Sequence, residues 1–307
     1  MATTNSITTS YSGEAARGFV SAALLSSPTI FNGGVTLYPN VKYKQVLKKL
    51  DTNQLLKDAT CDFTADSTLT QVERILTPKY LQVNLQLCKD DYRDTWDAIQ
   101  MGYSAHDVLP PDFASYLVGY AAAKVAAENE VNIWQGATGN SGEFDGFETL
   151  LADNAAQPAG QEVAGTTLSK ANIIAQTESV VDVIPSNVWG KEDLGIYMGT
   201  AALKFYIQAQ AAAGYLDKYN VDQTAYNFQG IPIMHAPGMS ADTMVAARKS
   251  DLAFGTGLVS DHNEVKVLDM ADLDGSQNVR IIMRLSAGAQ FVNGSDITTY
   301  GITNTGN

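Results

Sequence analysis

The residues of this chain that could carry chemistry are few and widely separated. Its three histidines are His106, His235 and His262. No two of them stand four positions apart, the spacing that places two zinc ligands on one helix face in an HExxH site. The GxSxG pattern of a nucleophile elbow is absent, and so is GxxxxGK followed by Ser or Thr. We therefore expect no catalytic residue, no cofactor-binding residue and no metal ligand, and we interpret each histidine as a loop or packing residue.

One acidic group has a composition that could suit calcium. Asp269, Asp272 and Asp274 precede Gly275, and closely spaced carboxylates before a glycine can surround a calcium ion. The spacing differs from the Asp-x-Asp-x-Asp-Gly loop, and no glutamate follows at the twelfth position. We interpret the segment as a solvated turn between two strands.

A second acidic group consists of Glu143, Asp145 and Glu148 in a glycine-rich stretch. Two carboxylates act as an acid–base pair only when their surroundings separate their pKa values. No histidine or lysine stands next to these residues to do so. We therefore predict a charged turn.

Four lysines, Lys42, Lys44, Lys48 and Lys49, form the basic cluster that we select as a candidate contact site between subunits. The chain has a formal net charge of -13. Ten of its 20 basic residues lie in residues 1–100 with ten acidic ones, and the other ten share residues 101–307 with 23 acidic residues. The lysines could form a solvated strand face, or they could meet the acidic body of another subunit. The sequence leaves both interpretations open.

Composition argues against several classes of protein. With 45% apolar residues, the 307-residue chain can bury a normal core. Its acidity disfavours direct, sequence-specific binding of nucleic acid. Cys61 and Cys88 are too few for a disulfide framework or a thiolate metal site, so we expect free thiols in a reducing compartment. We find no basic N-terminal region and no apolar run of membrane-spanning length, and we expect neither signal-directed export nor membrane insertion.

Two alternating segments should position the lysines. Residues 35–50 place Val41, Tyr43 and Leu47 on the face opposite the lysines. A long loop follows, and Lys79–Lys89 then alternates most cleanly, with leucine and valine on one face and polar residues on the other. We expect the two segments to form a two-stranded projection. Because an isolated hairpin is marginally stable in water, it would need another surface to lie on.

The rest of the chain predicts helices on a mixed sheet. A long helix should begin at Pro110–Pro111 and end at Gln135 before Gly136, because proline suits a helix start and glycine a helix end. An amphipathic helix is predicted over Thr166–Val183. A strand over Leu194–Gly199, a helix over Ala201–Ala213 and a long strand over Val279–Phe291 follow, and this order is typical of a mixed sheet flanked by helices.

These elements, in this order, resemble the major capsid protein of tailed bacteriophages, which has the Hong Kong 97 fold. Gly146 and Phe147 after the long helix resemble the family's Gly-Leu block, and Gln229–Ile233 resembles its Gly-hydrophobic-Pro-hydrophobic strand. Asp251–Gly255 then precedes the last strands. The resemblance implies an α+β fold with an N-terminal arm, an extended β-hairpin loop, a peripheral domain with a long spine helix and antiparallel strands, and an axial domain with a mixed sheet and flanking helices.

The resemblance covers nearly the whole chain and implies its domain boundaries. The implied parts are an N-terminal arm at 1–32, an extended loop at 33–88, a peripheral domain at 89–145 and 254–293, and an axial domain at 146–253 and 294–307.

The implied function is structural. The chain would assemble with copies of itself, as hexamers and pentamers, into the icosahedral head of a tailed bacteriophage, inside the host bacterial cytoplasm. Implied partners are scaffolding, portal and possible decoration proteins, together with double-stranded DNA enclosed without sequence-specific binding. Three alternatives stay open: an encapsulin-type bacterial compartment, an α/β enzyme, and a tail or adhesin subunit.

Overall fold

The computed structural model describes residues 28–52, 55–59, 61, 68–88, 111–213, 226–257, 265–271 and 275–306. The chain divides into two compact units. The first contains Tyr80–Asn129 and Val259–Leu285, and the second contains Pro28–Lys79, Glu130–Leu258 and Ser286–Asn307. Most of the predicted N-terminal arm lies outside the described residues, as do His106, His262, Asp272 and Asp274.

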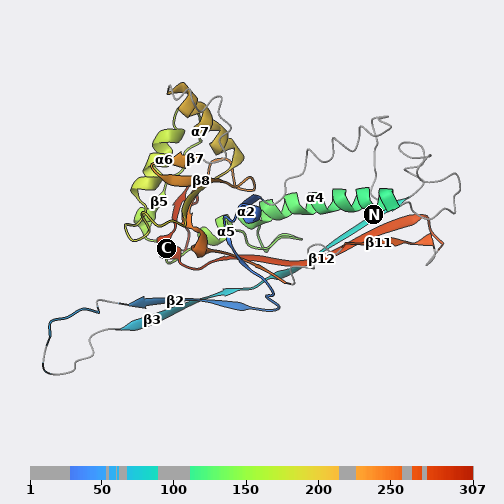
Figure 1. The fold of residues 1–307 in the computed structure, drawn as a ribbon, viewed down its shortest axis with the longest axis horizontal. Helices are drawn as coiled ribbons and strands as arrows, with labels where there is room; N and C mark the ends of the chain where they lie inside the picture. The colour runs from blue at the N-terminus through green and yellow to red at the C-terminus, as the bar shows by residue number, and fades with distance from the viewer. Residues whose placement is uncertain are drawn as a thin grey trace. The chain divides into compact units, whose positions relative to one another are not determined.

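The described chain contains both helices and strands (Figure 1). The helices are α2 (Pro28–Phe31), α4 (Pro111–Gln135), α5 (Phe147–Leu151), α6 (Ile173–Asp182) and α7 (Thr200–Ala212). The strands are β1 (Thr36–Tyr38), β2 (Gln45–Thr52), β3 (Leu69–Leu76), β4 (Lys79–Cys88), β5 (Glu162–Val163), β6 (Leu194–Met198), β7 (Tyr226–Phe228), β8 (Ile231–His235), β9 (Met244–Arg248), β10 (Leu252–Thr256), β11 (Val265–Asp269), β12 (Asn278–Phe291) and β13 (Thr298–Tyr300). Short 3-10 turns include η1 (Ala159–Gln161), η2 (Lys249–Asp251) and η4 (Gly294–Asp296).

The second unit is built on a six-stranded sheet in the order β5-β13-β9-β6-β8-β7. The sheet is mixed, because β6 pairs parallel with β8 and antiparallel with β9. All five residues of β6 are buried, as expected for a central strand covered on both faces. The mixed sheet predicted from the sequence is confirmed.

One face of this sheet packs against α6 and α7 (Figure 1). Alternate residues of β6 point to this face, and Ile196 lies opposite Ile233 of β8 and Ala246 of β9. The helices contribute large buried side chains, including Val180 and Tyr206. This cluster forms the main apolar core of the second unit.

The other face of the sheet packs against aromatic residues from α4 and α5. The indole ring of Trp134 lies 5.4 Å from the ring of Tyr197 on β6 and 5.4 Å from the ring of Phe147. All three side chains are almost fully buried. The sheet is therefore the middle layer of three, and the C-terminal end of α4 is fixed to it by Trp134.

The predicted long helix is confirmed, and its end has a steric cause. Helix α4 begins at Pro111 and ends at Gln135. A side chain at Gly136 would place its Cβ 2.3 Å from the carbonyl oxygen of Phe144 and 2.6 Å from that of Asn132. Only glycine lets the chain turn away from the helix at this point.

The amphipathic helix predicted over Thr166–Val183 is shorter than expected, since α6 begins at Ile173. Asn172 Oδ1 accepts hydrogen bonds from the backbone N–H and the hydroxyl of Ser169, at 2.7 Å and 3.0 Å. The backbone N–H of Leu168 donates to Asp242 Oδ1 at 2.8 Å. These side-chain bonds offer the backbone an alternative to the helix, which a periodicity of apolar residues does not reveal.

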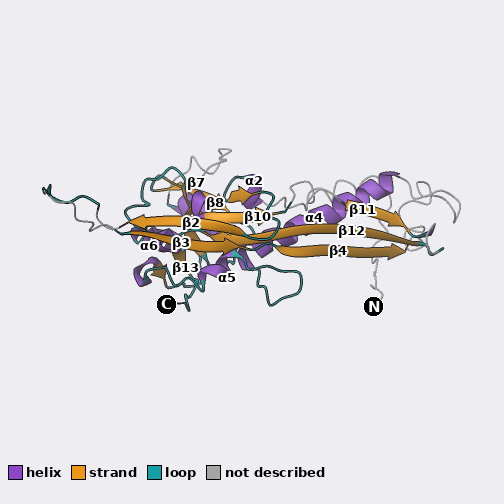
Figure 2. Cartoon of the chain, turned by 90° about the horizontal axis from the view of Figure 1, so that it is seen from below, coloured by secondary structure: helices purple, strands orange, loops and turns teal. Residues whose placement is uncertain are grey.

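In the first unit, β12 pairs with both β4 and β11 (Figure 2). The pairing with β11 is antiparallel and places Val267 opposite Ile281. Strand β4 has the predicted alternation, with Leu81 and Val83 half-buried and Gln82 and Asn84 exposed. The long C-terminal strand is confirmed, beginning one residue earlier than predicted.

The predicted two-stranded projection is wrong in its partners. Strand β2 pairs with β3, whereas the 79–88 strand pairs with β12. Strands β3 and β4 are separated at Thr77–Pro78, where proline lacks the N–H that a continuous strand would need. The 69–76 segment, which is nearer to β2 in sequence, pairs antiparallel with it in place of the predicted 79–88 segment.

The strand predicted over 35–50 is two strands, β1 and β2, separated by a turn. Asn40 has a φ of 63°, and its N–H donates to the carbonyl of Gly257 at 2.7 Å. Val41 is buried as expected, but Tyr43 is 75% exposed and does not share the buried face. The turn shifts the alternation, so the face assigned to Tyr43 was wrong.

A close approach of two glycines connects the ends of β5 and β13. A Cβ at Gly165 would lie 2.4 Å from the Cα of Gly301, which has a φ of 72°. We expect Gly165→Ala to lower the free energy of unfolding by about 1 to 3 kcal/mol, because backbone cannot yield as a side chain can. Gly160→Ala, where a Cβ meets no atom within 4 Å, should change it by less than about 1 kcal/mol in the same denaturant titration. Equal effects of the two variants would contradict this packing.

Candidate functional site

The β2–β3 hairpin is the candidate functional site, because it exposes one complete face. Its register runs from Gln45 opposite Leu76 to Thr52 opposite Leu69. Directly paired residues lie on the same face of an antiparallel ladder. One face, which we name the outer face, carries Val46, Lys48, Leu50, Thr52, Leu69, Gln71, Glu73 and Ile75. The opposite face, which we name the anchored face, includes Leu47, Lys49, Val72, Arg74 and Leu76.

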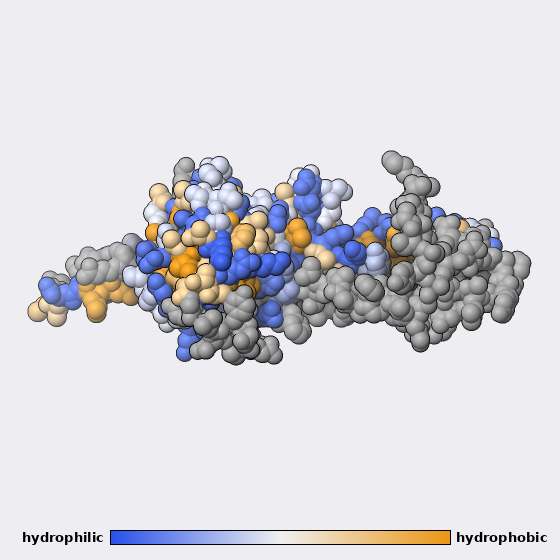
Figure 3. All heavy atoms as spheres, turned by 90° about the horizontal axis from the view of Figure 1, so that it is seen from above, coloured by the Kyte–Doolittle hydropathy of each residue, from blue (hydrophilic) through white to orange (hydrophobic). Residues whose placement is uncertain are grey.

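The outer face presents an apolar stripe to solvent. Val46 is 40% exposed, Ile75 48%, Leu50 62% and Leu69 66%. Figure 3 views the chain from above, the side opposite to that of Figure 2, where the strands β2 and β3 are covered and, at the hairpin, apolar atoms are visible only at the far left end of the view. Grouped exposed aliphatic side chains are typical of a surface that binds another macromolecule.

The base of the anchored face packs on the chain's own body. Leu47 and Leu76 are buried with Ala253, and the Arg74 guanidinium lies 3.8 Å from the ring centre of Phe291. Burial lowers the pKa of Arg74, against the attraction of Asp153. The Gln290 side-chain amide donates to the carbonyl of Ile75 at 3.2 Å. These contacts hold the anchored face against the body, so the outer face is the one that remains exposed to solvent.

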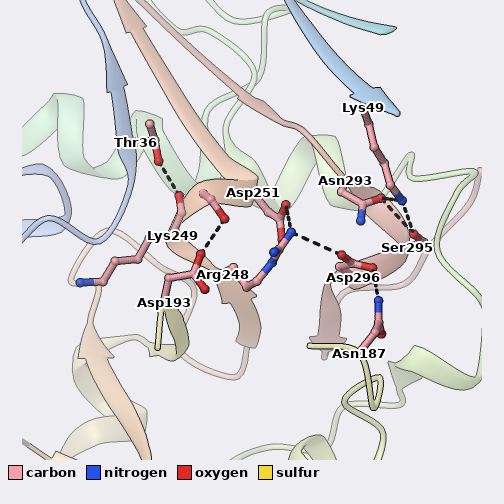
Figure 4. A network of polar contacts seen from close by, with 11 residues as sticks. Thr36, Lys49, Asn187, Asp193, Arg248, Lys249, Asp251, Asn293, Ser295 and Asp296 are labelled. Carbon is pink, nitrogen blue, oxygen red and sulfur yellow. Dashed lines mark hydrogen bonds and ion pairs between the residues drawn. The ribbon is translucent and has the colours of Figure 1, made fainter. Parts of the chain in front are cut away.

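The four candidate lysines do not share one surface. Lys42 and Lys44 precede β2 in an exposed turn, with Lys44 Nζ 5.5 Å from the ring centre of Tyr43. Lys48 lies on the outer face, 3.5 Å from a carboxylate oxygen of Glu73. Lys49 lies on the anchored face, where its Nζ donates to Asn293 Oδ1 at 2.8 Å (Figure 4). A contact role between subunits stays a prediction for these residues, and Lys49 has a partner in its own chain.

A polar network next to Lys49 holds together distant parts of the second unit (Figure 4). Arg248 binds both carboxylate oxygens of Asp251, at 2.9 Å and 3.0 Å, and reaches Asp296 at 3.4 Å. Asn187 also donates to Asp296, at 3.3 Å. Asp251 is 2% exposed, and burial raises its pKa while the bonds from Arg248 oppose the rise. The Arg248 guanidinium binds both carboxylates, so these opposite charges are paired with one another inside the second unit.

The acidic group at 143–148 is only partly the predicted turn: Glu143 and Asp145 precede α5, whereas Glu148 lies on this helix. Glu143 accepts from the N–H of Ala137 at 3.0 Å, and Asp145 accepts from the N–H of Thr138 at 2.7 Å. Glu148 accepts from the N–H of Ser240 at 2.8 Å and from the hydroxyl of Thr243 at 2.9 Å. Each carboxylate satisfies backbone or hydroxyl donors of a loop.

Of the remaining candidates, the structure describes His235 and Asp269, and each makes a hydrogen bond at the end of its own strand. His235 Nε2 lies 2.9 Å from Thr200 Oγ1, and burial lowers its pKa. Asp269 accepts from the N–H of Ala271 at the start of the β11–β12 turn. Within the described ranges, no three His, Cys, Asp or Glu residues are grouped to hold a metal ion. Likewise, no helix in the described part of the chain has both the length and the apolarity to cross a membrane.

One polar hollow lies at the ends of β5 and β13 and contains neither histidine, cysteine nor lysine. It is lined by Glu162, Val163, Ala164, Gly165, Thr166, Thr167, Asp242, Gly301, Ile302 and Thr303. Its Asp242 accepts the hydrogen bond from Leu168. The hydroxyl of Thr166, also in this lining, lies 3.1 Å from the hydroxyl of Tyr300.

Sequence reasoning missed the apolar stripe and the Arg248 network. The stripe depends on the pairing of β3 with β2, and the 69–76 segment was not predicted as a strand. Its alternation of Val72, Arg74 and Leu76 with Gln71, Glu73 and Ile75 was an available signal. The network joins Asn187, Arg248 and Asp296, which no spacing rule links.

Comparison by sequence finds no matching family model and no matching curated protein. Solved structures match over almost the whole chain. The capsid of a native GTA particle has a TM-score of 0.56 and 11% identity, covering 90% of this chain and 90% of that one. The capsid of the cyanophage P-SCSP1u has a TM-score of 0.57 and 11% identity, covering 90% and 88%. A chain of Mycobacterium phage Cain has a TM-score of 0.58 and 14% identity, covering 97% and 95%.

The chain therefore has the fold of phage and GTA capsid proteins. The α+β capsid fold expected from the sequence, with a β-hairpin, a long helix and a mixed sheet, is confirmed. At these levels of identity, it is the fold that is shared.

Lys48 and Lys49 are neighbours in sequence with different surroundings, which makes them a matched pair. We expect Lys49→Met to lower the free energy of unfolding by about 1 kcal/mol, because the buried Asn293 loses a charged donor. Lys48→Met should change it by no more than about 0.5 kcal/mol, since its ion pair with Glu73 is exposed. Denaturant unfolding measures both, and a larger loss for Lys48→Met would contradict the assigned faces.

Proposed function

We propose that this chain is a major capsid protein, a structural subunit that assembles into the icosahedral head of a tailed bacteriophage. The main supporting observation is the outer face of the hairpin, where the aliphatic side chains of Val46, Leu50, Leu69 and Ile75 are exposed among the residues that the structure describes. The match to capsid structures along about nine tenths of the chain supports the same role.

The mechanism is mutual covering of subunits. A two-stranded ribbon cannot bury both of its faces, and here its own body covers the base of only one. Burying one exposed leucine contributes about 1.5 to 3 kcal/mol, so a neighbour that covers Leu50 and Leu69 gains from both. The stability of the hairpin then belongs to the assembly rather than to the single chain.

We also propose the domain assignment that the resemblance implies. The parts are an arm at 1–32, an extended loop at 33–88, a peripheral domain at 89–145 and 254–293, and an axial domain at 146–253 and 294–307. The position of the β2–β3 hairpin within 33–88 and of α4 within 89–145 supports this assignment.

The proposed partners are copies of the chain, as hexamers and pentamers, with scaffolding, portal and decoration proteins. Assembly would take place in the bacterial cytoplasm, and the product would be the virion capsid. The net charge of -13 suits a container that encloses double-stranded DNA without gripping it. An encapsulin-type shell would form similar particles without DNA, a tail subunit would form rings or fibres, and an enzyme would form neither.

Negative-stain microscopy of the purified chain tests the proposal directly. We expect closed shells or capsomer-sized oligomers, and DNA in shells isolated from infected cells. A monomer at every protein and salt concentration would overturn the proposal, and rings or fibres would favour a tail subunit.

Leu50→Glu tests the outer face. We expect this variant to remain folded by circular dichroism but to yield no particles by size exclusion, because a charge would be buried against the neighbour. Gln45→Glu is the matched control, since Gln45 is exposed on the same strand but lies on the anchored face and receives the same added charge; it should form particles as the wild type does. Particles formed normally by Leu50→Glu would show that the outer face stays in solvent.

Lys44 and Lys48 test the proposed electrostatic contact. We expect Lys44→Glu with Lys48→Glu to slow assembly at low salt, because complementary charge mainly sets encounter rate and register. Added salt should reduce the difference, since it screens exposed charges. Light scattering measures the rate, and an assembly rate equal to that of the wild type at low salt would mean that both lysines only solvate the hairpin. Lys49 is left unchanged because it binds Asn293.

A further inference from the structure

Helix α4 carries a buried carboxylate that the proposed assembly role does not use. Glu130 is 1% exposed. Its carboxylate accepts hydrogen bonds from the hydroxyl of Thr29, from the N–H of Thr29 and from the N–H of Gly238. All three donors are neutral, and no cationic side chain in the described part of the chain is paired with it. A buried charge without a counter-charge is costly.

Three segments of the second unit meet at this carboxylate. The Thr29 oxygen also accepts from Trp134 Nε1 at 3.0 Å, so α2 is bound to α4 through one hydroxyl. The Gln135 side chain donates to the Gly238 carbonyl at 2.6 Å. A Cβ at Gly238 would lie 2.0 Å from the carbonyl oxygen of Glu130, so the backbone after β8 lies directly on the helix.

We propose that Glu130, Thr29 and Trp134 form a proton-operated latch, which holds Pro28–Gly34 on α4 while Glu130 is protonated and weakens when Glu130 ionises. A protonated carboxyl can still accept from the Thr29 hydroxyl, so the bond survives protonation. Ionisation places a charge where only neutral dipoles surround it. Ionisation therefore weakens the contact between the three segments, which are Pro28–Gly34, α4 and the loop at Gly238.

The sign of the pH dependence follows from burial. Burial raises the pKa of Glu130 above its ordinary value, and the hydrogen bonds from Thr29 and Gly238 only partly oppose the rise. The contribution of Glu130 to stability is therefore fully present below the pKa of the unfolded chain, and it is lost as the pH rises through the folded pKa.

Other titratable groups near the latch act differently. His235 precedes the Gly238 loop, and burial lowers its pKa, so its contribution is lost as the pH falls, opposite to that of Glu130. The Tyr197 hydroxyl donates to the carbonyl of Gly34, and burial raises its pKa, so it stays neutral. The α2 segment Pro28–Phe31 contains no ionisable side chain.

Hydrogen exchange of the full chain tests the latch. The N–H of Asn32, Gly33 and Gly34 donate to the carbonyls of Pro28, Ile30 and Thr29, at 2.9, 3.0 and 2.9 Å. After correction for the intrinsic exchange rate, we expect their opening in the wild type to increase about tenfold per pH unit between the unfolded and folded pKa of Glu130. Glu130→Gln keeps an acceptor for Thr29 and cannot ionise, so its opening should not depend on pH in this range.

Glu128→Gln is the matched control, because Glu128 is exposed on the same helix, and it should behave as the wild type. The latch is overturned if Glu130→Gln keeps the wild-type pH dependence. Should Glu130→Gln fail to fold, Thr29→Val provides the test: losing the hydroxyl donor raises the folded pKa of Glu130 further, so the increase in opening should continue to a higher pH before it levels off. An unchanged pH profile in Thr29→Val would equally overturn the proposal.

Discussion

A two-stranded sheet has two faces and no core of its own, and the arrangement of the second unit around the hairpin depends on this constraint. The chain uses Leu47, Leu76 and Ala253 to cover the base of one face. Arg74 stacks on Phe291 beside them. Among the residues that the structure describes, Leu50 and Leu69 on the other face stay in solvent. The outer face is therefore the surface that the proposed assembly would cover.

The polar residues of the second unit mostly serve to join segments distant in sequence. Arg248, Asp251 and Asp296 connect β9, η2 and η4. Glu143 and Glu148 bind the donors of two loops. In each case, a charge meets an opposite charge or several donors, which is what makes a partly buried ionic group tolerable. Groups held in this way are poor candidates for catalysis and good candidates for rigidity.

Glu130 is the most deeply buried of these carboxylates, and the donors that it meets are all neutral. Trp134, which donates a hydrogen bond to the same Thr29 hydroxyl, also packs between Phe147 and Tyr197 and so fixes α4 to the sheet. The same few residues thus hold together the end of the long helix, the start of the described chain and the loop after β8. A change in the charge of Glu130 acts on all three segments at once.

The sequence by itself determined the elements whose signals are local. Proline and Gly136 bounded the long helix, and strict alternation predicted β4 and β12. The absence of catalytic spacing was also readable, and the order of elements was enough to suggest the capsid fold. Only the tertiary structure decided that β2 pairs with β3, that Lys48 and Lys49 face opposite surroundings, and that Thr29 meets Glu130. The physical reason is that strand pairing and buried hydrogen bonds depend on the competition between distant segments for the same partners, and no window of sequence contains that competition.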